Sequence, residues 1–180
     1  DRVQATSTDL FDESYPNACV VKYEFAAKNG RGPVDLCWYD GGLKPMRPEC
    51  METGRRLGGS GILYQGTKGV IMQGSHGGVP RLVPEEKMRA FEVPEKTMKR
   101  SPGIHEEWIE AIVNGGQSST DFSYSGPLTE TMLLGNIAIL TSDQNTILEW
   151  DAKARRFTNL EAANELLSKE YRKGWSLEDM

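Results

Sequence analysis

Apolar and polar residues alternate most clearly between positions 18 and 27. Every second residue there is apolar, and the residues between them include the charged Lys22 and Glu24. Because the side chains of a strand point alternately to its two faces, this pattern predicts a half-buried strand. The apolar positions of this strand are Cys19, Val21, Tyr23, Phe25 and Ala27.

The same alternation returns at 34–38, after the turn-forming residues 29–33, Asn-Gly-Arg-Gly-Pro. This arrangement predicts an antiparallel hairpin. A second hairpin is expected for residues 62–64 and 70–72, which flank Gly-Thr-Lys-Gly at 66–69. The chain also begins in strand-like sequence, and residues 147–150 predict a further short strand.

Helical patterns follow in the second half of the chain, whereas the charged run 84–99 supports at most a short helix. Ser101 and Pro102 are typical of a helix start and Gly115 of a helix end, so the first helix is expected at 102–114. A second, largely buried helix is expected to open at Gly126-Pro127, and a third to be capped by Asn159. The apolar positions of these helices are Ile104, Trp108, Ile109 and Ile112; Leu128, Met132, Leu133, Ile137 and Leu140; and Leu160, Ala163, Leu167 and Tyr171.

The order of these elements indicates the fold class. Strands come first and helices later, without strand–helix–strand alternation, which favours an α+β fold. We expect an open, predominantly antiparallel or mixed sheet with helices packed on one face. The 180 residues suit one domain and are few for two.

Charge and cysteine content exclude several classes. The chain has a net charge of −5, and its Lys and Arg residues are interspersed with Glu and Asp, which disfavours nucleic-acid binding. The longest apolar run is too short to cross a membrane. Three cysteines without C-x-x-C spacing, at positions 19, 37 and 50, indicate free thiols rather than disulfides or a structural zinc site. The missing initiator Met leads us to expect a piece of a longer protein.

Aromatic and charged residues are combined in segment 36–48, where a predicted strand opens into a loop stiffened by two prolines. Aromatic faces suit the C–H surfaces of carbohydrates, and charged groups suit their hydroxyls. The alternative is a solvated loop whose Trp lies in the core. The candidate substrate-binding residues of this segment are Trp38, Tyr39, Asp40, Lys44 and Arg47.

Two histidines, His76 in a glycine-rich loop and His105 at the start of the first helix, are weaker candidates for substrate contact. They are too few for a three-His metal site, and neither is paired with a nucleophile in a known motif. Residues 59–64, Gly-Ser-Gly-Ile-Leu-Tyr, begin like a dinucleotide fingerprint, but Tyr64 replaces the third glycine and a strand follows. We expect no metal and no cofactor bound by this chain alone.

Six short motifs, spread over nearly the whole chain, carry a resemblance to a known family. Together they resemble the C-terminal domain of the Gfo/Idh/MocA oxidoreductases, in the branch common in Bacteroidetes and Planctomycetes. The motifs are 34–45 (Val-Asp-Leu-Cys-Trp-Tyr-Asp-Gly-Gly-Leu-Lys-Pro), 66–69 (Gly-Thr-Lys-Gly), 80–84 (Pro-Arg-Leu-Val-Pro), 100–108 (Arg-Ser-Pro-Gly-Ile-His-Glu-Glu-Trp), 126–130 (Gly-Pro-Leu-Thr-Glu) and 170–175 (Glu-Tyr-Arg-Lys-Gly-Trp).

The resemblance implies that residues 1–180 form a substrate-binding and dimerisation domain, preceded in a parent enzyme by a Rossmann domain that binds NAD or NADP. Hydride would pass between the nicotinamide and a hydroxyl of a sugar or cyclic polyol. The family's Glu-Lys-Pro and Asp-x-x-x-His motifs are missing, because Thr97 follows Glu95-Lys96 and neither His76 nor His105 has an Asp four residues before it. No catalytic residue is therefore assigned, and the chain alone is expected to be inactive.

Two alternatives remain: a domain of an NAD-dependent glycosidase of the same family, and a self-associating structural module without a ligand. The strand pattern itself leads us to expect a homodimer through the open face of the sheet. That face mixes apolar and charged residues, as interfaces do. Its members are Val20, Ala26, Cys37 and Tyr39 with Lys22, Glu24 and Asp35.

Overall fold

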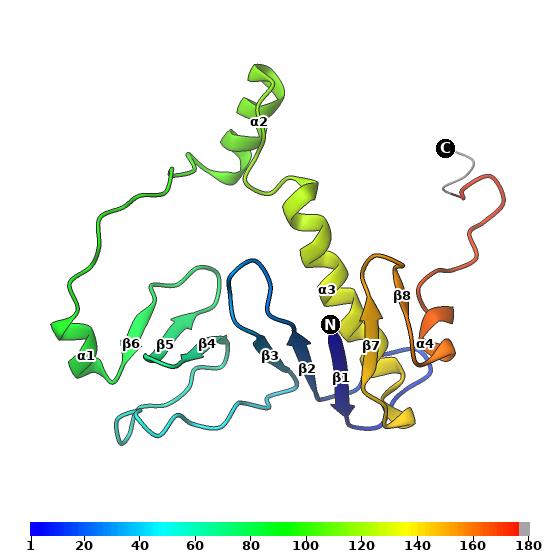
Figure 1. The fold of residues 1–180 in the computed structure, drawn as a ribbon, viewed down its shortest axis with the longest axis horizontal. Helices are drawn as coiled ribbons and strands as arrows, with labels where there is room; N and C mark the ends of the chain where they lie inside the picture. Colours follow the sequence, from blue (N-terminus) through cyan, green and yellow to red (C-terminus); the bar gives the residue numbers. More distant parts are fainter. Residues whose placement is uncertain (177–180) are drawn as a thin grey trace. The chain divides into compact units, whose positions relative to one another are not determined.

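The computed structural model describes residues 1–176, which divide between two compact units. Among the described residues, the main unit comprises Asp1–Leu43 and residues 103–176, and the middle unit comprises Lys44–Pro102. Each unit has its own antiparallel sheet (Figure 1). The expectation of one C-terminal domain within a longer parent stays a prediction.

The sheet of the main unit has five strands in the order β3-β2-β1-β7-β8, and all neighbours are antiparallel. Both the predicted strand and its hairpin partner are confirmed. Asn29 and Gly30 have φ values of 53° and 80°, which a tight type I′ turn requires, and Lys28 and Arg31 exchange two backbone hydrogen bonds across it. The strands are β1 (Arg2–Ser7), β2 (Cys19–Phe25), β3 (Val34–Tyr39), β7 (Leu148–Asp151) and β8 (Arg156–Phe157).

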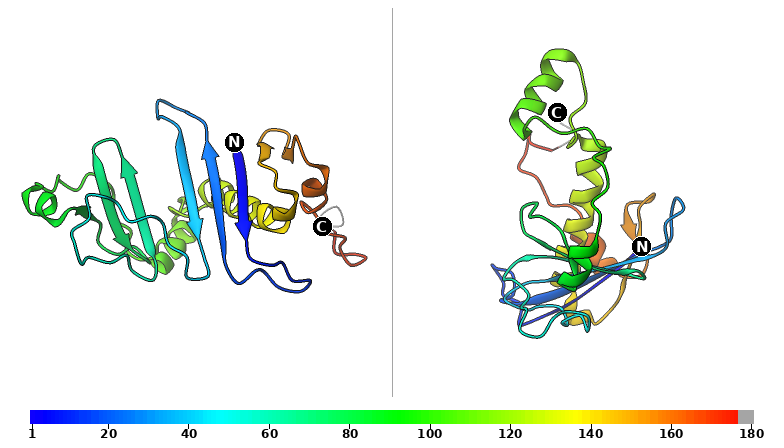
Figure 2. Two further views of the ribbon diagram at one scale, coloured as in Figure 1. Left: turned by 90° about the horizontal axis from the view of Figure 1, so that it is seen from below. Right: turned by 90° about the vertical axis from the view of Figure 1, so that its left-hand side faces the viewer.

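Helix α3 (Phe122–Leu140) covers one face of this sheet over β1 and β2 (Figures 1 and 2). The core lies between them, and each fully buried aliphatic or aromatic side chain there contributes about 1.5–3 kcal/mol to folding. The alternation of β2 is confirmed, because Cys19, Val21 and Tyr23 are buried toward the helix. The other core residues include Val3, Leu134, Ile137, Leu148, Trp150 and Phe157.

The start and the burial of α3 differ from the sequence expectation. The helix begins at Phe122, because the Asp121 side chain caps it by accepting a hydrogen bond from Ser123 N (2.7 Å), and Pro127 lies inside it. Burial is confined to the part that crosses the strands, residues 134–139, and the first turns project beyond the sheet (Figure 1). Of the five positions expected to be buried, only Ile137 is buried, and Leu128, Met132, Leu133 and Leu140 are exposed.

Helix α2 (Ile104–Asn114) confirms the predicted helix and its end at Gly115, but Gly103 rather than Ser101 precedes its first residue. None of its residues is buried, so its apolar stripe faces solvent in the described chain. The third expected helix is much shorter, because α4 covers only Glu161–Glu165. Asn159 is not its cap: its side chain accepts from Glu149 N (3.0 Å) and donates to Ile147 O (2.7 Å), which fastens the chain to β7.

The middle unit contains the second predicted hairpin, β4 (Gly61–Gly66) and β5 (Gly69–Gly74), extended by β6 (Arg81–Val83). One short helix, α1 (Glu85–Ala90), follows, as the charged run allows. A single-turn 3-10 helix, η1 (Ser142–Gln144), completes the described elements. The α+β class is therefore confirmed. None of the helices in residues 1–176 combines the length and apolar character needed to cross a membrane.

Packing of α3 on the sheet depends on Gly135. A Cβ atom added to Gly135 would lie 1.9 Å from the hydroxyl oxygen of the buried Tyr23. We therefore expect Gly135→Ala to lower the free energy of unfolding by about 2–3 kcal/mol, measured by urea denaturation. Removing the hydroxyl with Tyr23→Phe should restore part of this loss in the double variant.

Gly126→Ala is the matched control on the same helix, since no atom lies within 4 Å of its added Cβ. The gain in helix propensity is opposed by crowding of the new Cβ against the ring of Pro127, so the stability of this variant should change by less than about 1 kcal/mol. Equal effects of the two substitutions would contradict the proposed close contact.

Candidate functional site

Two candidates of the main unit, Trp38 and Tyr39, lie at the end of β3 but point to different sides of the sheet. Trp38 is paired with Val21 and therefore shares the helix-facing side, although it is 53% exposed. Tyr39 is paired with Val20 on the opposite, open face. The two rings therefore lie on opposite faces of the sheet and do not contribute to one common site.

Asp40 directly follows strand β3 and shapes the turn there. Its backbone nitrogen donates to Cys19 O (3.0 Å), and its carboxylate accepts from Gly41 N (2.8 Å). A side chain at Gly41 would meet Asn17 O at 2.1 Å, so the chain passes too close to its neighbour for any other residue. Gly41 is therefore explained by a close backbone approach, and Gly42 by its positive φ of 85°.

The cationic candidates Lys44 and Arg47 belong to the middle unit and bind backbone carbonyl oxygens there. Lys44 Nζ donates to Leu57 O (3.3 Å). The Arg47 guanidinium donates to Met51 O (2.6 Å) and also to Glu52 O. Both cations thus brace the loop that carries them.

The two histidines lie in different units. His76, with φ of 56°, occupies the left-handed position of a tight turn in which Gly78 N donates to Ser75 O (3.2 Å). His105 is exposed in the first turn of α2. Among the contacts of residues 1–176, none joins His76 to Lys44 or Arg47, and none joins His105 to the end of β3.

Glu52, which the sequence analysis did not single out, organises the braced loop. Its carboxylate accepts hydrogen bonds from Glu85 N and from Arg55 (3.1 Å), so it connects the loop to the start of α1. The hydrogen bond from Glu85 N, followed by those from its own backbone and from Arg55, lowers the Glu52 pKa from 4.5 to about 2. The sequence signal that could have pointed to this contact is the three-residue spacing of Glu52 and Arg55.

The open face of the main sheet carries a row of alternating charges. Lys22 Nζ lies 2.6 Å from Glu24 Oε1 and 3.6 Å from Asp35 Oδ2, and Arg2 Nη2 lies 2.5 Å from Glu24 Oε2. The hydrogen bond from Lys22 is the main cause that lowers the Glu24 pKa, and the same bond raises the Lys22 pKa. Register places Val20, Cys37 and Tyr39 on this face, so its mixed composition agrees with the sequence expectation.

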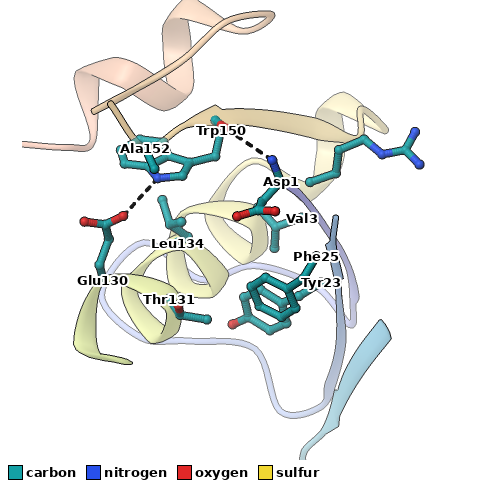
Figure 3. A pocket seen from close by; sticks show the side chains of 10 residues that line it. Asp1, Val3, Tyr23, Phe25, Glu130, Thr131, Leu134, Trp150 and Ala152 are labelled. Carbon is teal, nitrogen blue, oxygen red and sulfur yellow. Dashed lines mark hydrogen bonds between the residues drawn. The ribbon is translucent and has the colours of Figure 1, made fainter. Parts of the chain in front are cut away.

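A pocket of about 50 Å³ opens between β1, β2, β7 and α3 in the main unit (Figure 3). Trp150 Nε1 donates to the Glu130 carboxylate (3.0 Å), and Asp1 N donates to Trp150 O (3.4 Å). None of the candidate residues predicted from sequence lines it. Its residues are Asp1, Arg2, Val3, Tyr23, Phe25, Glu130, Thr131, Leu134, Trp150 and Ala152.

Sequence reasoning missed the pocket because its lining comes from four elements that are distant along the chain.

Within the described residues, no three His, Cys, Asp or Glu side chains are placed so that they could hold a metal ion. Comparison with protein-family models and with curated proteins finds no match to this chain.

The low pKa of Glu52 predicts an acid-sensitive contact in the middle unit. Because the folded pKa lies below the ordinary 4.5, the ionised carboxylate stabilises the fold above about pH 4.5, and this stabilisation is lost as the pH falls toward 2. The amide proton of Glu85 should therefore titrate with a midpoint near 2 in NMR spectra.

Glu52→Gln removes the titrating charge but keeps an acceptor, so the Glu85 amide shift should shrink to the part that titration of the Glu85 side chain itself causes. A midpoint at or above 4 in the unmodified protein would show that the carboxylate does not hold the Glu85 amide.

Proposed function

We propose that this chain is the substrate-binding and dimerisation domain of an NAD(P)-dependent oxidoreductase that acts on a hydroxyl of a sugar or cyclic polyol. The observation that carries the proposal is the resemblance of six motifs, in order, to the C-terminal domain of Gfo/Idh/MocA oxidoreductases. The α+β architecture with an uncovered sheet face supports it.

The positions of the motifs within the fold give them structural roles that support the proposal. Segment 34–45 comprises β3 and the turn after it, 66–69 is the turn between β4 and β5, and 80–84 contains β6. Segment 100–108 contains the start of α2, and 126–130 lies in α3. Four of these five therefore lie at turns or element ends, where an exact backbone path requires particular residues.

The nicotinamide cofactor would be bound by the parent's Rossmann domain. In this chain, Gly59-Ser60-Gly61 leads directly into β4, whereas a dinucleotide fingerprint needs a helix whose N-terminus faces the pyrophosphate. The residues present therefore do not fit a dinucleotide. Trp38, Tyr39, Asp40, Lys44, Arg47, His76 and His105 remain the proposed substrate-contacting residues.

An assay of the full-length parent tests this function. It should reduce NAD⁺ or NADP⁺ stoichiometrically with one member of a panel of sugars and cyclic polyols, whereas chain 1–180 alone should show no saturable micromolar NADH binding. Lys44→Ala in the parent should lower kcat/KM about tenfold while the parent stays folded, and Lys87→Ala, at an exposed position of α1 outside the six motifs, should leave it unchanged.

The two alternatives have different outcomes in the same assay. An NAD-dependent glycosidase would cleave nitrophenyl glycosides with catalytic NAD⁺ and no net NADH. A structural module would show neither reaction. Equal kcat/KM values of the two Lys variants would show that Lys44 stabilises its loop and does not contact the substrate.

Association through the open face of the sheet is the second part of the proposal. Charges of both signs lie side by side on this face, so a two-fold axis can pair each with its opposite, and the face has no helical cover within the described residues. We expect a homodimer that buries about 1,600 Å² or more in total. Analytical ultracentrifugation at micromolar concentration should detect it.

Cysteine alkylation locates the interface, because Cys37 lies on the open face and Cys50 lies in the middle unit, both exposed. Raising the protein concentration should slow alkylation of Cys37 and leave Cys50 unchanged. Tyr39→Asp should abolish the dimer, whereas Lys153→Glu in the β7–β8 turn should not. A monomer with concentration-independent alkylation of both cysteines would overturn the dimer.

A further inference from the structure

We propose that Asn29 is a site of spontaneous deamidation, and that the isoaspartate formed there loosens the turn between β2 and β3. This site is separate from the proposed substrate-contacting residues and does not depend on the proposed oxidoreductase function. An Asn-Gly sequence favours the chemistry, because glycine has no Cβ to keep its backbone nitrogen away from the preceding side chain. The chain contains two such pairs, Asn29-Gly30 and Asn114-Gly115.

The reacting groups of Asn29-Gly30 are exposed and unengaged in the turn at the end of the hairpin (Figure 1). A Cβ added to Gly30 would meet no atom within 4 Å, so space is available beside its nitrogen. The two hydrogen bonds of the turn join Lys28 and Arg31 (3.2 and 3.1 Å) and leave the central pair out. Within residues 1–176, neither the Asn29 side chain nor Gly30 N makes a hydrogen bond, so no contact opposes their reaction.

The second pair, Asn114-Gly115, is equally exposed but held in place. Asn114 is the last residue of α2, and Gly115 N donates a hydrogen bond to Ala111 O. This bond belongs to the helix end, where a residue with positive φ caps the last turn. Attack by Gly115 N therefore requires the end of the helix to open first. The structure thus distinguishes two identical dipeptides and selects Asn29.

Deamidation of Asn29 needs only water as a co-reactant. Gly30 N gives its proton to hydroxide and bonds to Asn29 Cγ, while the bond from Cγ to Nδ2 breaks. Ammonia leaves with a proton from water, which regenerates the hydroxide, and a five-membered succinimide ring remains. Water then opens the ring. Cleavage between Gly30 N and Cγ yields aspartate, whereas cleavage between Gly30 N and the main-chain carbonyl carbon of residue 29 yields isoaspartate.

The two products should affect the turn differently. Asn29 and Gly30 both have positive φ, 53° and 80°, as a two-residue type I′ turn requires. Aspartate before glycine suits the same turn, so that product keeps the backbone path. Isoaspartate directs the chain through Cβ and Cγ and adds one carbon atom to the main chain. The paired hydrogen bonds between Lys28 and Arg31 cannot both keep their geometry across the longer connection.

Peptide mapping by mass spectrometry, after incubation of the full chain at mildly alkaline pH, tests the site. The mass increase from replacement of NH₂ by OH should appear at Asn29 about tenfold faster than at Asn114, because only Gly115 N must break a hydrogen bond. In urea, the rate at Asn114 should rise toward that at Asn29. Equal rates in the folded chain, or a rate at Asn29 that is much lower in the folded chain than in urea, would overturn the inference.

Hydrogen exchange of the Arg31 amide tests the effect on the turn. The isoaspartyl form, separated from the aspartyl form by chromatography, should exchange this proton faster than the unmodified chain does. Asn29→Asp is the matched control, since it carries the same charge on an unaltered backbone and should leave the exchange rate unchanged. Equal exchange in the isoaspartyl and unmodified forms would show that the turn is not loosened.

Discussion

The close approach of helix α3 to strand β2 is the contact on which the main unit depends. Tyr23 is buried directly against the backbone of Gly135, where no other residue leaves room for its hydroxyl. This contact sets the distance between helix and sheet, and therefore the packing of Val21, Leu134 and the other core residues around it. The pocket of about 50 Å³ lies beside the same Tyr23, so its shape follows from the same close approach.

With α3 on one side, the sheet acquires two faces of different chemistry. The covered face contains the apolar core, and the open face carries the row formed by Arg2, Glu24, Lys22 and Asp35. A face that alternates in charge and includes Val20 and Tyr39 is suited to a self-complementary contact. The proposed dimer therefore uses the side of the sheet opposite to the apolar core.

In the middle unit, charged residues stabilise an irregular loop rather than a core. Lys44 and Arg47 donate to backbone carbonyl oxygens, and Glu52 accepts from the Glu85 amide. Such bonds replace the ladder hydrogen bonds that a loop lacks. A substrate that contacts Lys44 would have to replace the hydrogen bond from Lys44 to Leu57 O. The kinetics of Lys44→Ala therefore distinguish a substrate contact from stabilisation of the loop.

Local pattern determined much of the fold. Period-two alternation fixed β2 and β3, and the Asn29-Gly30 turn fixed their antiparallel pairing, because these features depend on neighbours in sequence. Gly115 likewise ended α2 where expected. Burial of α3 and the length of the third helix were not determined locally: apolar spacing marks a face that can be buried, whereas the position of the sheet decides which part of that face is covered.

The candidate site likewise combines features that the local sequence determined with features that only the tertiary structure decided. The sequence determined that Trp38 and Tyr39 end a strand, and that Asp40 and two cations follow it. Alternation alone places Trp38 and Tyr39 on opposite faces, and only the tertiary structure decided which of these faces α3 covers and that Arg47 binds backbone carbonyls, because both depend on partners distant along the chain. The pocket of Tyr23, Glu130 and Trp150 had no sequence signal, since its residues meet only when the helix packs on the sheet.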